Sequence, residues 1–132
     1  MRVMVIVKAS KQSEAGEPPS ADVIERVHAL NEEMTKAGVL VGMGGLQPSA
    51  NGKRLSVRGG KRMVIDGPFT ETKELIAGYA ILDVSSMDEA LRWLERFPDG
   101  GEDEDIEIRP MYDEGPCGSG YKDELKAAAA AE

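Results

Sequence analysis

The chain has 132 residues, a length that predicts one domain around a single hydrophobic core. Its 24 acidic and 16 basic residues give a net charge of −8, which disfavours binding to nucleic acid or to an anionic membrane. One histidine and one cysteine are too few for a structural zinc site or an internal disulfide. No apolar run reaches the roughly 18 residues of a membrane span, and the N-terminus lacks a signal-peptide cleavage region. We therefore expect a soluble, cytoplasmic protein.

The first part of the chain predicts a strand, a helix and a second strand. Residues 3–7 are rich in β-branched side chains, which is typical of a strand, and the polar residues 9–19 predict a loop. A helix is predicted after Ser20, a suitable N-cap, and it ends at Gly38. Its apolar stripe recurs at spacings of three and four: Val23, Val27, Leu30, Met34 and Ala37. Residues 39–46 predict the second strand, whose glycines indicate a bulge or a close approach.

The second part predicts a hairpin, two more strands and a helix between them. Residues 55–58 and 62–65 alternate on either side of Gly59-Gly60, which predicts a hairpin. Residues 66–74 predict a loop. The most apolar strand, and hence the central one, is predicted at residues 76–84. Ser86 and Glu89 predict a capping box for a helix that ends at Pro98, and alternation over residues 105–111 predicts the last strand.

This order of elements indicates an α+β fold of the ferredoxin-like type, β-α-β-hairpin-β-α-β, with two helices on one face of an antiparallel sheet. The other face of the sheet has no helix to cover it. We therefore expect this face to be buried against a second copy in a symmetric homodimer. Residues 1–112 are predicted to form the domain. Residues 113–132 are predicted to form a flexible tail, which contains Cys117 and, after it, a short Ala-rich helical segment.

One stretch, DGPFTETKE at Asp66–Glu74, is followed by Gly78-Tyr79 and resembles the DGPF family of YCII-related proteins. Further likeness lies in residues 37–48, 88–93 and 107–110, so the resemblance covers residues 1–112. It implies a ferredoxin-like domain that dimerises into an α/β barrel. It implies little about activity, although family members often sit beside extracytoplasmic-function sigma factors.

The loop at residues 66–74 contains most of the candidate site residues. Turn chemistry explains Asp-Gly-Pro by itself, whereas a pocket beside the loop would also explain the residues that follow. If such a pocket exists, Asp66 or Glu74 is the base of a proton-transfer reaction. Lys73 or Arg109 then stabilises negative charge on the bound molecule. The remaining ligand-binding candidates are Gly67, Pro68, Phe69 and Tyr79.

Each candidate has a structural alternative. The charged run after Phe69 is also typical of a solvated loop, and a strand tyrosine commonly packs in a core. His28 lies on the polar flank of its predicted helix, which favours an exposed histidine over a catalytic one. The run Gly42–Gly45 lacks the helix that follows a phosphate loop, and the acidic residues 102–105 lack the spacing of a calcium loop.

These patterns predict a dimer that binds a small polar molecule in a pocket beside the 66–74 loop, or an enzyme that transfers a proton on that molecule. No residue pattern indicates a cofactor or a metal. The alternative is a non-catalytic regulatory or partner-binding module that acts with an extracytoplasmic-function sigma factor; a third hypothesis is a purely structural dimerisation domain. The first hypothesis requires a pocket that contacts Asp66 and a carboxylate there with a raised pKa.

Overall fold

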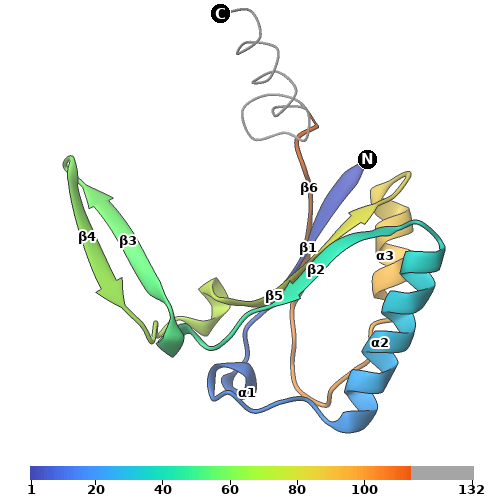
Figure 1. The fold of residues 1–132 in the computed structure, drawn as a ribbon, viewed down its shortest axis with the longest axis horizontal. Coiled ribbons are helices and arrows are strands. Elements are labelled where there is room, and N and C mark those ends of the chain that lie inside the picture. The colour runs from blue at the N-terminus through green and yellow to red at the C-terminus, as the bar shows by residue number, and fades with distance from the viewer. Residues whose placement is uncertain (114–132) are drawn as a thin grey trace, which may run out of the picture.

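The structure is a computed structural model, and it describes residues 1–113. Four strands form an antiparallel sheet in the order β2-β5-β1-β6: β1 (Arg2–Lys8), β2 (Leu40–Gly45), β5 (Ile76–Asp83) and β6 (Ile106–Pro110). Helices α2 (Ala21–Lys36) and α3 (Met87–Leu94) lie on one face of this sheet (Figure 1). The predicted mixed α+β class with antiparallel pairing is confirmed. The predicted tail, including Cys117, lies outside the described residues from residue 114 onward.

Alternation along β1 divides the sheet into a core face and an open face. Val3 and Val5 are buried on the core face, at 0% and 3% exposure, where they join Leu82 and residues of both helices. Met4 and Ile6 alternate with them and therefore point to the opposite face, which we call the open face. The strand predicted to be central, β5, pairs with both β1 and β2 as expected.

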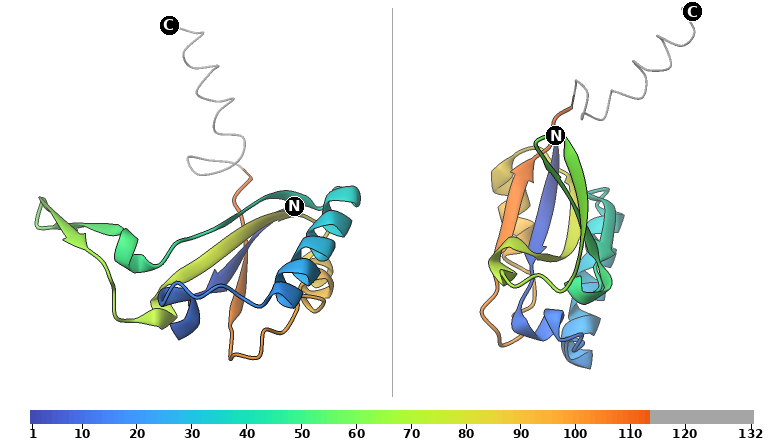
Figure 2. Two further views of the ribbon diagram at one scale, coloured as in Figure 1. Left: turned by 60° about the horizontal axis from the view of Figure 1, so that its bottom comes forward. Right: turned by 90° about the vertical axis from the view of Figure 1, so that its left-hand side faces the viewer.

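Strands β3 (Lys53–Arg58) and β4 (Lys61–Asp66) form a separate two-stranded sheet. We call residues 53–66 the arm. Figures 1 and 2 show that the arm extends away from the four-stranded sheet instead of packing on it. The hairpin itself is predicted by the sequence, and Gly59 and Gly60 at its turn both have positive φ, as the tight turn requires. Its separation from the sheet is not predicted.

A short helix, α1 (Lys11–Glu14), lies within residues 9–19, where the sequence predicts only a loop. This prediction is wrong because a helix of four polar residues has no apolar stripe to reveal it. Its start is nonetheless encoded locally. The Ser10 side chain accepts a hydrogen bond from the Ser13 backbone N–H, and Ser13 returns the interaction to the Ser10 N–H.

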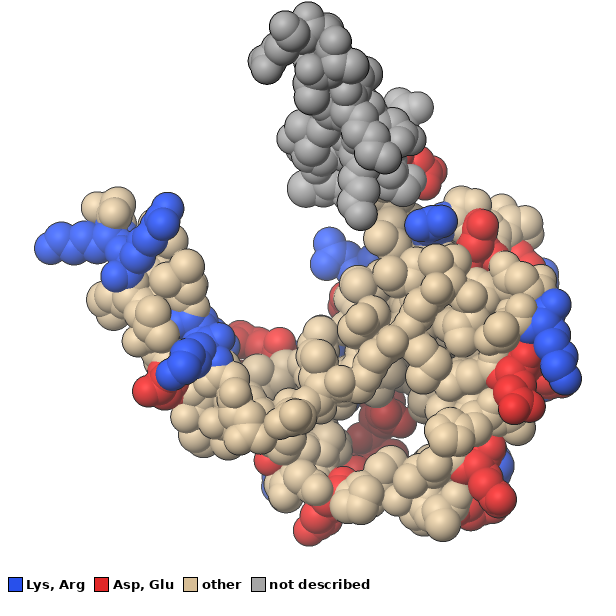
Figure 3. Space-filling view, viewed as in Figure 1, with Lys and Arg blue, Asp and Glu red and all other residues tan. Residues whose placement is uncertain are grey.

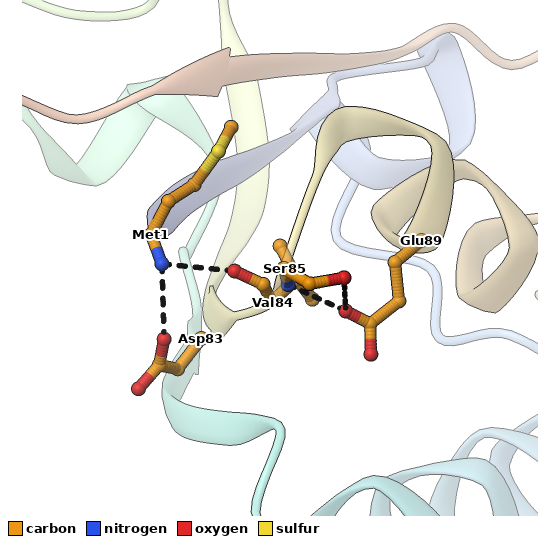
Figure 4. A network of polar contacts seen from close by, with 5 residues as sticks. All are labelled: Met1, Asp83, Val84, Ser85 and Glu89. Atoms are coloured by element: carbon orange, nitrogen blue, oxygen red, sulfur yellow. Dashed lines mark hydrogen bonds and ion pairs between the residues drawn. The ribbon is translucent and has the colours of Figure 1, made fainter.

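The start of α3 differs in one detail from the predicted capping box. Ser86 caps the helix by accepting from the Glu89 N–H at 3.2 Å, as predicted. The Glu89 carboxylate, however, accepts from the N–H and the hydroxyl of Ser85, at 2.6 and 2.9 Å (Figure 4). Next to it, the Met1 amino group donates to the Val84 carbonyl at 2.9 Å. This contact joins the beginning of β1 to the end of β5.

Candidate functional site

A cavity of about 410 Å³ lies between α2 and the core face of the sheet. Its walls are mainly apolar and come from α2, β1, β2, β5 and the segment after α3. The polar residues that line it are Ser10, Gln12, Ser13, Glu17, Ser20, His28, Asn31, Tyr79, Glu102 and Glu104. Figure 3 shows the hollow, with acidic side chains visible inside it. The cavity therefore combines an apolar interior with a partly acidic border.

The cavity forms where α2 separates from the sheet. Leu30 and Met34, in the second half of the helix, are buried in the core. Val23 and Val27, in the first half, belong to the same apolar stripe but are only half-buried, because the cavity lies beneath them. The stripe that predicts the helix thus continues past the packed core and becomes a wall of the cavity.

Three glycines, Gly44, Gly45 and Gly78, belong to the sheet side of the cavity. Gly45 lies directly opposite Gly78 in the pairing of β2 with β5, and both line the cavity. Their neighbours Gly44 and Tyr79 form the next pair and alternate to the open face. A Cβ atom on Gly44 would lie 2.9 Å from the Tyr79 ring, so the glycine is needed for that ring to lie over β2. The close approach predicted for this strand is confirmed.

The acidic border of the cavity changes the titration of one carboxyl group. Partial desolvation, together with the negative charges of Glu102 and Asp99, raises the pKa of Glu104 above its ordinary value. Glu104 keeps much of its area in contact with solvent, yet enough protein surrounds the carboxyl group to disfavour its charged form. His28 is exposed, as predicted, but it borders this same cavity. Glu104 and His28 are therefore the acid–base candidates that the sequence analysis did not select.

Asp66, the first candidate base, lies away from the cavity. It ends β4 at the base of the arm, and its carboxylate accepts from the Lys53 Nζ at 2.5 Å across the hairpin. Its side chain is 75% exposed, and it is not among the residues that line the cavity. Asp66 therefore does not belong to this cavity. The carboxyl group with a raised pKa belongs to the 99–107 segment instead.

The glycine and phenylalanine of the 66–74 loop make structural contacts. A Cβ atom on Gly67 would lie 1.7 Å from the Ser49 carbonyl oxygen, so another residue there would have to displace the backbone. The Phe69 N–H donates to the Ser49 Oγ at 3.0 Å, and the guanidinium of Arg54 lies 4.0 Å from the Phe69 ring centroid. Pro68 follows Gly67 through a cis peptide bond. The loop therefore packs against the 3-10 turn η1 (Ser49–Asn51).

Ser49 connects this loop to the edge of the cavity. Its hydroxyl donates to a carboxylate oxygen of Glu14 in a short hydrogen bond, and its N–H donates to the other oxygen at 2.9 Å. Glu14 belongs to α1, and the preceding residues Ser10 and Ser13 line the cavity. Neither Ser49 nor Glu14 was selected from the sequence, because the signal is a contact between residues 35 positions apart.

The other candidates lie in two further places. Lys73, in the 3-10 turn η2 (Thr72–Glu74), lines a charged groove with the acidic residues 102–105 and Glu107. Glu74 is exposed in the same turn. Arg109 lies opposite Met4 on the open face. Tyr79, whose side chain alternates to that face, is the one predicted site residue among those that line the cavity within residues 1–113. The structure therefore does not bring Asp66, Glu74, Lys73 and Arg109 together around one site.

Within residues 1–113, no cluster of three or more His, Cys, Asp or Glu side chains has a geometry that could hold a metal ion. None of the helices in this part of the chain is long and apolar enough to cross a membrane.

Comparisons with known proteins identify a matching family and similarities to individual proteins. The sequence model of the YCII-related domain family matches residues 1–113. A protein of Rhizobium meliloti (strain 1021), named only as uncharacterized, is 36% identical over 69 residues. That match covers 52% of this chain and 56% of the other, so this chain spans little more than half the length of its curated relative.

Among solved structures, similarity is found to 5-chloro-2-hydroxyhydroquinone dehydrochlorinase (TftG) from Burkholderia phenoliruptrix AC1100, in complex with 2,5-dihydroxybenzoquinone. The TM-score is 0.46 at 17% sequence identity, with 85% of this chain and 95% of that chain covered.

Proposed function

This chain belongs to the YCII-related domain family, and we propose that it binds a small molecule in the cavity between α2 and the sheet. The observation that carries the proposal is the cavity itself, about 410 Å³ with mainly apolar walls and a polar border. Small-molecule sites are typically concave spaces of roughly 300–1,000 Å³ with apolar walls and a few convergent polar groups. The cavity has this size and this distribution of side chains.

The border of the cavity favours one type of head group. Glu17, Glu102 and Glu104 supply carboxyl groups there, and the serines and Asn31 can donate or accept hydrogen bonds. A bound amine or hydroxyl group would be stabilised by these carboxylates, whereas a carboxylate would be repelled by them. The proposed ligand therefore has an apolar body and an amine or hydroxyl head.

A catalytic role of this site would be proton transfer at that head group. A carboxyl group whose pKa is raised holds its proton to higher pH than an ordinary one and can donate it to the head group, and an imidazole can accept a proton from the head group. Glu104 and His28 both border the cavity and take these two roles in place of Asp66 and Glu74. The 66–74 loop then acts as a positioning element for α1 through Ser49 and Glu14.

The ligand proposal is tested by filling the cavity. The full chain is screened by thermal shift against single-ring compounds that carry an amine, a hydroxyl or a carboxylate, and hits are titrated by calorimetry. Val27→Phe replaces a small aliphatic side chain of the cavity wall with an aromatic ring, so it is expected to weaken binding of the hits at least about tenfold. Leu91→Phe, on the exposed side of α3, is the matched control and is expected to leave binding unchanged.

Two results would contradict the proposal. One is a hit whose affinity survives Val27→Phe while the protein remains folded. The other is a preference for carboxylates over amines and hydroxyls, which would refute the role of the acidic border.

We also propose the homodimer and the ferredoxin-like half-barrel that the sequence predicts. Support comes from the open face, where no helix of residues 1–113 packs and where Met4, Ile6, Tyr79 and Ile81 lie together on β1 and β5. A contiguous apolar surface on a sheet is most readily buried against a second copy. The regulatory module acting with a sigma factor stays a prediction.

A further inference from the structure

The arm exposes an unusual amount of apolar surface. Five of its side chains are between 39% and 65% exposed: Leu55, Val57, Met63, Val64 and Ile65. The pairing of β3 with β4 places Leu55 opposite Val64 on one face and Met63 on the other. Both faces of the hairpin are therefore partly apolar and uncovered. A lone two-stranded hairpin in water is at best marginally stable, so an arm of this kind requires a surface to pack on.

Among residues 1–113, the polar and ring contacts between strands of the arm and its neighbours lie at the base of the arm. The Gly67 N–H donates to the Gly52 carbonyl at 3.0 Å, Lys53 pairs with Asp66, and Arg54 lies over Phe69. The apolar side chains farther out lie beyond these contacts. Figures 1 and 3 show the outer part of the arm standing clear of the body, with the open face of the sheet on the same side of the molecule. Arm and open face thus border one concave space.

The charge of the arm is opposite to that of the body. The arm has five basic residues and one acidic residue, and its basic residues are Lys53, Arg54, Arg58, Lys61 and Arg62. The rest of residues 1–112 has nine basic and 18 acidic residues, a net charge of −9. A second copy of this chain therefore presents a body that attracts the arm, and charge complementarity of this kind favours association.

We propose that the arm of each copy docks on the body of a second copy, so that two arms clasp the dimer reciprocally. This inference rests on the proposed dimer through the open face and adds a second contact to it. A two-fold axis makes the exchange symmetric, because each copy supplies one arm and one receiving surface. Docking would bury the apolar side chains of the arm and bring its basic residues to the acidic body of the partner.

A photocrosslinking experiment distinguishes exchange of arms from a dimer without it. Full chains carrying Val57→benzoylphenylalanine, one preparation labelled with 15N and one unlabelled, are mixed, irradiated and digested. Crosslinked peptides that join a labelled to an unlabelled chain are expected in yields comparable to the same-label pairs. Leu91→benzoylphenylalanine, at an exposed residue of α3, is the matched control and should give no mixed pair.

A second variant measures how much the docking stabilises the dimer. Leu55→Ser combined with Val64→Ser removes an exposed apolar pair from one face of the arm. It is expected to weaken dimerisation about tenfold by light scattering across a dilution series, while Leu91→Ser has no effect. Circular dichroism of each variant confirms that the body is folded.

Each remaining outcome overturns the inference. A wild-type dimer that gives no mixed crosslink at Val57 would refute arm docking and leave the dimer intact. A wild-type monomer would refute both. Sedimentation with phosphatidylserine vesicles, lost in Lys61→Glu with Arg62→Glu and accompanied by no mixed crosslink, would assign the arm to an anionic membrane instead.

Discussion

Two glutamates show how neighbouring groups set the titration of one side chain in opposite directions. Glu104 has a raised pKa because it is partly desolvated and lies near Glu102 and Asp99. Glu89 has a lowered pKa because it accepts hydrogen bonds from the Ser85 backbone and side chain. A raised pKa means that the folded state binds the proton more tightly than the unfolded state, so stability falls as pH rises through that window. For Glu89 the sign is reversed, and stability is lost as pH falls.

Substitution of these glutamates should therefore shift stability in opposite directions. Glu104→Gln removes a charge that the fold disfavours, so we expect a higher Tm at neutral pH and no gain below about pH 4, where the carboxyl group is protonated in both states. Glu89→Gln removes a charge that the fold stabilises, so we expect a lower Tm at neutral pH. Calorimetric unfolding scans between acid and neutral pH measure both effects. Equal shifts of the same sign would contradict the assignment.

At the scale of elements, the sequence predicts most of the helices and strands of the body. The stripe over residues 23–37 predicts α2, and the capping serines Ser20 and Ser86 mark the starts of α2 and α3 correctly. The strands are predicted within a few residues of their bounds. The helix α1 is missed because it is too short to have a periodic pattern. The separation of the arm from the sheet is missed because alternation is the same in a hairpin that is buried and one that is not.

Substitution of Ser49 tests how much the contacts between elements stabilise the fold. Ser49 lies in η1 and forms hydrogen bonds with α1 and with the 66–74 loop. Ser49→Ala leaves a carboxylate oxygen of Glu14 and the Phe69 N–H without this partner. We expect a loss of about 1–3 kcal/mol in the free energy of unfolding, measured by urea denaturation. Ligand affinity should fall too, because α1 borders the cavity.

The matched control is Ser56→Ala, which removes a serine hydroxyl from the arm. It is expected to change the free energy of unfolding by less than about 0.5 kcal/mol, as is usual for substitutions away from such contacts. If both variants lose the same free energy of unfolding, the hydrogen bonds of Ser49 to Glu14 and Phe69 do not stabilise the fold more than an ordinary surface serine does.

At the scale of the whole molecule, apolar area and charge are distributed unevenly over the surface. One face of the sheet is covered by two helices, the other is open, and the arm projects beyond it. Charge follows the same division, with a basic arm on an otherwise acidic body. A molecule in which apolar surface and opposite charges are segregated in this way favours self-association over a monomeric state.

The open face gives the matching prediction for the dimer. Ile6→Glu places a negative charge in the middle of β1 on that face, opposite Tyr79 and the like charge of Glu107. Light scattering should then give the 14.2 kDa mass of one chain in place of twice that mass, since an unpaired charge in a buried contact is strongly unfavourable. Leu91→Glu on α3 should leave the dimer intact. A dimer that persists in Ile6→Glu would place the contact elsewhere.

The sequence by itself determined the α+β class, the order and approximate bounds of most elements, and the hairpin turn. Those features depend on local periodicity, capping side chains and glycines, which can be identified in the sequence. The tertiary structure decided where the cavity lies. The cavity depends on how far α2 separates from the sheet, and the raised pKa of Glu104 depends on neighbours brought close by a loop. Asp66 was selected because its motif is distinctive, yet the residues that follow it contact Ser49 and position the backbone. The chemistry of a site depends on which side chains lie close together in the fold, and the spacing of residues along one sequence does not determine this.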